Sequence, residues 1–211
     1  TVGDAVTASA SEDDSPFSVD LLQGASDADT TDSLNVDAIT LDSGDASGVT
    51  VSGNSLTIDT AAYKSFAVGE SAVIAYSYNV VDGNGGIATQ SATITITGVN
   101  DSPTVGGAVT ASASEDDSSF SVDLLQGAND ADTSDSLNVA SLILDSGDAS
   151  GVTVSGNSLT IDPSAYNSLA VGESAVIEYS YNVVDGNGGS TAQPATITIT
   201  GVNDAPTVGD A

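Results

Sequence analysis

Carboxylates are the side chains in this sequence whose type and spacing indicate a chemical role. An Asp-x-Asp motif occurs at Asp27 and Asp29 and returns at Asp130 and Asp132. Alternate residues of a turn can direct their oxygens at one ion, and carboxylate, amide and backbone carbonyl oxygens are the ligands that Ca²⁺ takes in proteins. The alternative is a solvated turn that is closed by Asx hydrogen bonds. We favour the metal site, because several acidic loops are expected to converge with this motif.

The net charge favours a cationic ligand and argues against several other functions. The 211 residues include 30 acidic side chains against a single basic one, Lys64, with neither His nor Cys, so that the formal net charge is −29. Self-repulsion of this size destabilises a compact chain unless cations screen it. Nucleic acids and anionic membranes need Lys and Arg, and the usual general bases and nucleophile pairs are missing. We therefore expect no nucleic-acid partner, no membrane contact and no enzymatic activity.

The chain is a tandem repeat. Residues 1–103 and 104–206 align without gaps and differ at 18 positions, and residues 207–211 begin a third copy. Such a repeat is long enough for a unit with its own core and too long for a solenoid, whose units have about 20–50 residues. The sequence thus predicts two domains, 1–103 and 104–206, in an excerpt from a longer array. Lys64 is expected to be an ordinary exposed residue, because the second copy has Asn167 in its place.

Alternating β-branched and polar residues predict that each repeat is all-β. In the first repeat we expect strands at residues 6–11, 17–21, 34–41, 49–51, 56–58, 74–80 and 92–97. The segment 60–70 breaks this alternation and is expected to be a short helical or irregular crossover that places Tyr63 and Phe66 in the core. Seven short strands in about 100 residues are typical of an immunoglobulin-like sandwich. Disorder, the alternative for so acidic a chain, is not expected, because 39% of the residues are hydrophobic and alternate in this way.

The topology of such a sandwich gathers the acids at its two ends. Successive strands run in opposite directions, so the loop at 27–32 and the turn at 82–86 are expected at the N-terminal end of the repeat. The turn at 12–14, Glu70 and the linker at 98–101 are expected at the opposite end. Two carboxylates about 6 Å apart in water repel by roughly 0.7 kcal/mol, and a divalent cation reverses the sign of that interaction. Ca²⁺ tolerates a mixed ligand set better than Mg²⁺ does. For the turn at 82–86, a plain hairpin without a metal is an equally good explanation.

Three stretches of the sequence resemble a known family. They are Ala62–Ser71, the turn segment Tyr78–Gly86 and the boundary segment Ile94–Asp101, and the corresponding stretches recur in the second copy. They are similar to the VCBS and cadherin-like repeats of giant bacterial RTX adhesins, which are exported by type I secretion, and especially to repeats of the ice-binding adhesin type. Ice binding belongs to a different module of such proteins and is not implied here. The resemblance implies tandem immunoglobulin-like, cadherin-like extender modules, which form a stalk that calcium stiffens at its junctions.

The resemblance to cadherin repeats also implies a set of calcium ligands. These are a glutamate after the first strand, a glutamate before the sixth, the acids of the linker and the Asp-x-Asp motif of the following repeat. The linker here has one acid where cadherins have more, so the number of ions per junction stays open. Together with the acidic loops, these correspondences predict the following Ca²⁺ ligands: Glu12, Asp13, Asp27, Asp29, Glu70, Asp82, Asn100, Asp101, Glu115, Asp116, Asp130, Asp132, Glu173, Asp185, Asn203 and Asp204.

The leading hypothesis for function is a calcium-stiffened spacer in the stalk of a secreted, biofilm-associated adhesin on the bacterial cell surface. Its partners would be calcium ions and the neighbouring repeats of the same chain, and the chain is expected to be monomeric. Two alternatives stay open. The repeats could themselves bind a glycan or a neighbouring chain, although aromatic residues make up only 4% of the sequence, or they could be accessory domains of a secreted hydrolase. The length of the parent array would discriminate between them, because many identical repeats favour the stalk.

Overall fold

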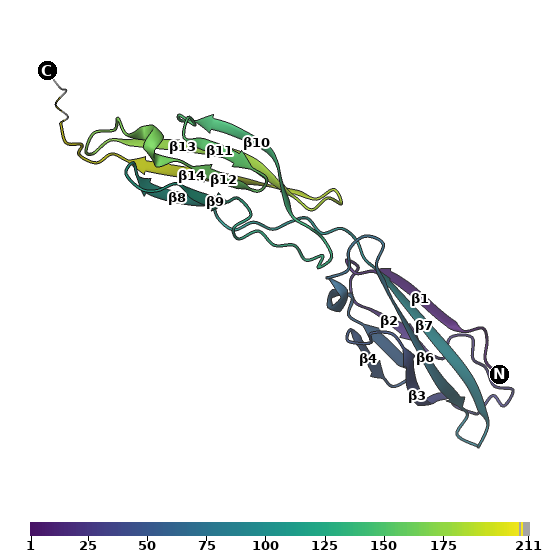
Figure 1. Cartoon of the computed structure of the whole chain (residues 1–211). Coiled ribbons are helices and arrows are strands. Elements are labelled where there is room, and N and C mark those ends of the chain that lie inside the picture. Colours follow the sequence, from purple (N-terminus) through teal and green to yellow (C-terminus); the bar gives the residue numbers. More distant parts are fainter. Residues whose placement is uncertain (207, 209–211) are drawn as a thin grey trace. The chain divides into compact units, whose positions relative to one another are not determined.

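The computed structural model describes residues 1–206 and Val208. The chain divides into two compact units, of which the first is Thr1–Asn100 with Ala131–Ser134 and the second is the remainder. Each unit, taken by itself, is a sandwich of two β-sheets (Figure 1), which confirms the predicted all-β fold. The domain boundaries at 103 and 206 stay predictions. The predicted start of a third repeat at 207–211 lies, apart from Val208, outside the described residues.

The first unit has, within the described residues, seven strands and one short 3₁₀ helix. They are β1 (Val6–Ser11), β2 (Phe17–Asp20), β3 (Asn35–Ser43), β4 (Val49–Ser52), β5 (Ser55–Ile58), η1 (Thr60–Tyr63), β6 (Ser71–Val81) and β7 (Ile87–Thr97). One sheet has the order β1-β7-β6-β3 and the other the order β2-β5-β4. β1 pairs with β7 in parallel. This pairing is expected when successive strands alternate in direction, because the first and the seventh strand then run the same way.

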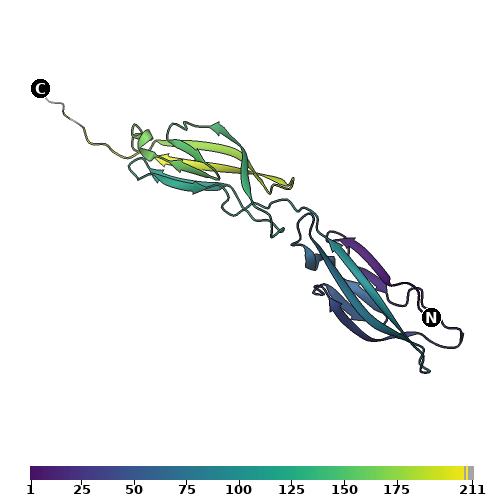
Figure 2. The same cartoon turned by 45° about the vertical axis from the view of Figure 1, so that its right-hand side comes forward.

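The second unit repeats the same order of elements, and Figure 2 shows its strands from a second direction. They are β8 (Val109–Ser114), β9 (Phe120–Asp123), β10 (Asn138–Ser146), β11 (Val152–Ser155), β12 (Ser158–Ile161), η2 (Pro163–Tyr166), β13 (Ser174–Val184) and β14 (Ser190–Thr200). Its sheets have the orders β10-β13-β14-β8 and β11-β12-β9. No helix in the part of the chain that the structure describes has the length and apolar character needed to cross a membrane.

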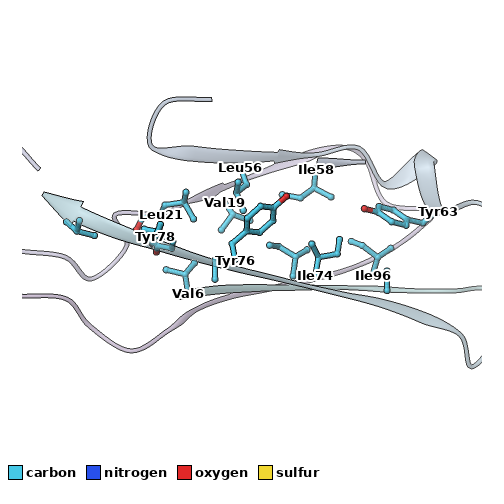
Figure 3. Packing of buried hydrophobic residues seen from close by; sticks show 14 residues of the cluster. Val6, Val19, Leu21, Leu56, Ile58, Tyr63, Ile74, Tyr76, Tyr78 and Ile96 are labelled. Carbon is cyan, nitrogen blue, oxygen red and sulfur yellow. Dashed lines mark hydrogen bonds between the residues drawn. The ribbon is translucent and has the colours of Figure 1, made fainter. Parts of the chain in front are cut away.

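The core of the first unit lies between its two sheets. Figure 3 shows Val19 and Leu56 of one sheet packed against Ile74, Tyr76 and Tyr78 of the other. Alternate residues of β6 are buried, as the sequence pattern predicts. Burying one large apolar side chain contributes about 1.5–3 kcal/mol, so this interior supplies the apolar burial on which the fold depends. The corresponding residues form the core of the second unit.

The predicted crossover is the 3₁₀ helix η1 and the turn that follows it. Asp59 caps this helix by accepting the Ala61 N–H at 3.2 Å. The Tyr63 hydroxyl is buried, donates to the Asp45 carbonyl at 2.8 Å and accepts the Gly48 N–H at 3.3 Å. Tyr63 is thus in the core as predicted, while Phe66, whose ring centroid is 5.8 Å from that of Tyr63, is only partly buried.

The edge strand β3 is irregular in a way that the sequence does not reveal. Its pairing with β6 shifts register between Asp37 and Thr40, where Ala38 has a φ of +53°. β10 repeats this irregularity, with Ser141 also at φ +53°. A bulge of this kind bends an edge strand and blunts its tendency to pair with another chain.

Candidate metal centre

Three carboxylates of the second unit come together at its N-terminal end. Asp130 and Asp135 belong to the loop between β9 and β10, and Asp185 follows β13. One oxygen from each of them lies within 4.8 Å of the others. Asp130 and Asp135 are half-buried, and Asp185 is 4% exposed. The predicted ligands Asp130 and Asp185 are therefore brought together, and Asp135, which the ligand set from the sequence omits, joins them.

The turn after β13 positions Asp185. Its Oδ1 accepts the backbone N–H groups of Asn187 at 2.7 Å, Gly188 at 3.0 Å and Gly189 at 3.0 Å. Gly186 and Gly188 have φ angles of 91° and 117°, which residues with a side chain rarely adopt. The glycines of the sequence motif thus fold the turn so that its amides converge on one carboxylate.

Asp135 connects the acidic loop to this turn. Its Oδ1 accepts the Asn187 side-chain amide at 2.7 Å. Its Oδ2 is buried and has no hydrogen-bond partner among the described residues. A buried carboxylate oxygen without a partner is costly, and a hard cation would satisfy it. The donor set, which consists of carboxylate oxygens only, suits Ca²⁺.

The first unit arranges the corresponding acids differently. Asp27, Asp29 and Asp32 form a cluster of their own, again with one oxygen of each within 4.8 Å of the others. Asp27 and Asp29 are exposed, and Asp27 Oδ1 accepts the Asp29 N–H at 3.0 Å. This is the Asx turn that the sequence offered as the alternative to a metal site. The geometry of this loop is compatible with both roles.

Asp82 serves its own turn. Its Oδ1 accepts the Asn84 N–H at 2.7 Å and the Gly86 N–H at 2.9 Å. The bond from Asn84 is the largest cause of the lowered pKa of Asp82. A hollow of about 200 Å³ beside it is lined by Asp27, Asp82 and apolar side chains that include Leu34. Asp82 therefore has the hairpin role, and a role as ligand stays a prediction.

The glutamates of the opposite end hold backbone amides. Glu12 is 1% exposed, and its Oε1 accepts the Val99 N–H at 2.8 Å. Glu115 is equally buried and accepts Val202 N–H at 2.8 Å and Leu169 N–H at 3.2 Å. These carboxylates thereby secure the segment that follows the last strand of each unit. Sequence reasoning missed this role, and no motif distinguishes it.

The other predicted ligands are placed as follows. Glu70 and Glu173 each accept an N–H group three residues back, at 3.0 Å and 2.8 Å. Asp13 pairs with Lys64, so that Lys64 is not merely the exposed residue expected from the sequence. Asp116, which corresponds to Asp13 in the second repeat, is exposed. The remaining residues adjoin the boundary between the units or the end of the second one, and their part in a site stays a prediction: Asn100, Asp101, Asp132, Asn203 and Asp204.

Comparisons with solved structures find cadherin repeats. The first two repeats of human mucin-like protocadherin are 15% identical, with 78% of this chain and 84% of that chain covered and a TM-score of 0.47. The first two repeats of human protocadherin-24 are 16% identical, with 95% of both chains covered and a TM-score of 0.46. Repeats one to four of Drosophila N-cadherin are 17% identical, with 95% of this chain and 49% of that chain covered and a TM-score of 0.46.

Comparisons of the sequence give a more definite result. No curated protein matches the chain. The profile of a family described as cadherin-like domain matches residues 1–97 and again residues 99–200. The two matches together span most of the sequence and fall on the two copies of the repeat. The chain therefore belongs to the cadherin-like domain family, with two such domains in tandem.

Proposed function

We propose that this chain is a calcium-binding extender segment from the stalk of a large, secreted bacterial adhesin of the RTX type. Cadherin-like domains in tandem support a spacer, because each additional domain adds length. The net charge of −29 supports a chain that functions with bound cations. In this proposal the chain lies outside the cell, acts by position rather than by catalysis, and presents a ligand-binding tip located elsewhere in the parent protein.

The cluster of Asp130, Asp135 and Asp185 is the observation that carries this proposal. Three carboxylates whose oxygens lie within 4.8 Å of one another repel unless a cation or protons intervene. The buried Oδ2 of Asp135, which has no hydrogen-bond partner among the described residues, adds a position that a cation would satisfy. Ca²⁺ takes about 6–8 oxygens in a tolerant geometry, so backbone carbonyls and water would complete its shell. Bound Ca²⁺ would tie the loop after β9 to the turn after β13.

Stiffening of the tandem array by calcium is part of the same proposal. It rests on the charge of the chain and on the resemblance of its repeat ends to those of cadherins. The ligands proposed for the repeat ends are those that the sequence predicts, with Glu12, Glu70, Asn100 and Asp101 from one repeat and Asp130, Asp132 and Asp185 from the next. Millimolar calcium, the range typical of extracellular modules, would suffice to fill them.

Thermal unfolding in calcium and in chelator, at matched ionic strength, tests the proposal. A ligand that binds only the folded chain adds about 2.7 kcal/mol at a hundredfold excess over its dissociation constant. We expect calcium to raise the melting temperature and Asp135→Asn to reduce that rise. Asp145→Asn is the matched control, because Asp145 is exposed and lies in β10 outside the cluster. Equal melting temperatures with and without calcium would contradict the proposal.

Solution scattering on the same samples separates binding from stiffening. If calcium stiffens the array, the maximum dimension of the two-domain chain becomes longer and more narrowly distributed as calcium is added. Sodium at equal ionic strength screens the repulsion but does not bridge carboxylates, so it should not reproduce the effect. A melting temperature that rises while the scattering curve stays the same would leave calcium binding intact and remove the stalk mechanism.

A further inference from the structure

The glycine-rich turn after the sixth strand occurs in both copies of the repeat, and its central asparagine is chemically reactive. Asp82–Gly86 and Asp185–Gly189 both read Asp-Gly-Asn-Gly-Gly, so that Asn84 and Asn187 are each followed by glycine. A glycine has no Cβ to hinder its backbone nitrogen. That nitrogen is able to attack the side-chain amide carbon of the asparagine before it, which is the first step of deamidation. The two copies allow a comparison within one molecule.

The backbones of the two turns are nearly the same. The first turn has φ angles of 82° at Gly83 and 108° at Gly85. The second has 91° at Gly186 and 117° at Gly188. The backbone N–H of the central asparagine donates to the first aspartate at 2.7 Å in both turns. A difference in reactivity between the two asparagines therefore does not come from the shape of the turn.

The surroundings of the two asparagine side chains differ. The Asn187 amide donates to Asp135 Oδ1 at 2.7 Å. Asn84 is exposed, and its side-chain amide makes no hydrogen bond to another described residue. Asp32, the counterpart of Asp135, lies in the cluster with Asp27 and Asp29 instead. The amide carbon of Asn84 is thus free to rotate toward the next backbone nitrogen, whereas that of Asn187 is held in place.

The attacking nitrogens have similar surroundings in the two turns. The Gly188 N–H donates to Asp185 Oδ1 at 3.0 Å. In the first turn the Gly85 N–H also interacts with the carboxylate of its own turn, that of Asp82. The nitrogen must lose its proton before it attacks, and a hydrogen bond to a carboxylate keeps that proton in place. The nitrogens therefore do not distinguish the two sites, and the freedom of its side-chain amide makes Asn84 the more reactive residue.

We propose that Asn84 is a site of spontaneous deamidation and that Asp135 protects Asn187 from the same reaction. The Gly85 nitrogen gives its proton to a solvent base and forms a bond to Cγ of Asn84. The bond between Cγ and Nδ2 breaks, and Nδ2 takes up a proton and leaves as ammonia, so that a five-membered succinimide remains. Water then opens either of the two ring C–N bonds and gives aspartate or isoaspartate. One water enters, one ammonia leaves, and nothing is oxidised or reduced.

The modification changes the acidic end of the first unit. Each event replaces a neutral amide by a carboxylate in a turn that already begins with Asp82. Isoaspartate also lengthens the main chain by one carbon between Asn84 and Gly85, and therefore disturbs the hydrogen bond from Gly86 N–H to Asp82. The negative charge of this end would increase with the age of the protein. This inference does not depend on calcium and is tested in its absence.

Peptide mapping of the aged chain measures both reactions at once. The whole chain is incubated in mildly alkaline buffer with chelator, sampled over time and cut with a glutamate-specific protease. The two turn peptides differ in mass, because Ile87 follows one turn and Ser190 the other. We expect Asn84 to convert about tenfold faster than Asn187, the factor that one hydrogen bond to a charged group typically supplies. In denaturant the two rates should become similar, since the pentapeptides are identical.

Two variants identify the cause of the difference. Asp135→Ala should raise the rate at Asn187 to that at Asn84, while the matched variant Asp32→Ala should leave the rate at Asn84 unchanged. Circular dichroism checks that each variant is folded, and Asp135→Asn replaces Asp135→Ala if the latter is not, with an intermediate rate expected at Asn187. Equal rates in the native chain would overturn the proposal. A difference that persists in the folded Asp135 variant would overturn the protective role of that residue.

Discussion

The acidic N-terminal loops of the two units have nearly the same sequence and different arrangements. In the second unit Asp135 lies with Asp130 and Asp185. In the first unit Asp32 lies with Asp27 and Asp29. The carboxylates correspond one to one in the sequence, and the neighbouring differences are small, such as Ser26 in place of Asn129. The same acids can therefore form two different clusters, so the motif specifies the candidates for a site but not the set that meets.

The sandwiches, in contrast, agree in detail. The buried tyrosine of the crossover donates to a loop carbonyl at 2.8 Å in the first unit and 2.7 Å in the second. Tyr78 and Tyr181 donate to the carbonyls of Leu21 and Leu124, in each case at 2.8 Å. Packed interiors admit few alternatives, whereas solvated loops admit many. Corresponding substitutions in the two units should therefore have equal effects in the core and unequal effects in the loops.

Alanine at Gly44 or Gly147 should give the largest loss of stability, and an equal one in both units. These residues have φ angles of +93° and +92°, and a Cβ at either would lie 2.2 Å from the carbonyl oxygen of Val73 or Val176. Backbone strain and the clash together should cost about 3 kcal/mol or more of the free energy of unfolding. Denaturant unfolding measures the loss.

Gly53→Ala is the control for that comparison. Gly53 has a φ of +57°, but a Cβ there would meet nothing within 4 Å, so only the left-handed strain of about 1–2 kcal/mol remains. Unequal losses for the Gly44 and Gly147 variants would show that the two sandwiches are not equivalent.

Alkaline pH should unfold both units through their tyrosines. Burial is the largest cause that raises the pKa of all six, and it raises that of Tyr181 to about 12. A raised pKa in the folded chain means that the unfolded chain loses its protons first as pH increases. The contribution of the tyrosines to stability should thus be complete below pH 10, the ordinary pKa of tyrosine. It should be lost as the pH rises toward the higher pKa values that the tyrosines have in the folded chain.

Phenolate absorbance and circular dichroism, followed together, measure this loss. The two signals should change in a single step, because the phenols ionise when the core opens. Phenols that ionise near pH 10 while the β signal is intact would show that the tyrosines are less shielded than the structure indicates.

Most of the fold could be predicted from the sequence, because alternation decides which side of a strand is buried. The buried positions of β6 follow from that rule alone. The bulges at Ala38 and Ser141 could not be predicted, because neither residue type favours a φ of +53°. Local sequence carries no signal for such a feature when a neighbouring strand imposes it.

The candidate site could be predicted only in part. Position along the strands placed Asp130 and Asp185 at one end, and the structure brings them together. The contact from Asn187 to Asp135 depends on the conformation of two loops that are distant in the sequence, so no spacing rule reveals it. Glu12 was assigned from its place in the acidic turn at 12–14 and from the resemblance to cadherin repeats. Its hydrogen bond to the Val99 N–H is a structural role beside any role as a ligand.

The smallest expected effect concerns the single base. Lys64 pairs with Asp13, and their side chains are 43% and 47% exposed, so that the pair should contribute about 0–1 kcal/mol at low salt and less at high salt. The second unit has Asn167 instead. In the orientation that turns its amide nitrogen toward the backbone carbonyl oxygens of Glu115 and Ser164, Asn167 donates to them at 3.1 Å and 3.3 Å. Lys64→Asn should therefore recover part of the loss through the equivalent contacts.

Denaturant unfolding of Lys64→Asn at low and at high salt tests this prediction. We expect a destabilisation below about 1 kcal/mol that salt removes, because two exposed charges interact weakly in water. Asn167→Lys is the reciprocal variant. It gains an ion pair with Asp116 but gives up two hydrogen bonds, and the two changes should nearly cancel. If Lys64→Asn instead costs several kcal/mol at high salt, the one base of the chain has a structural role in the first unit that the second unit fulfils in another way.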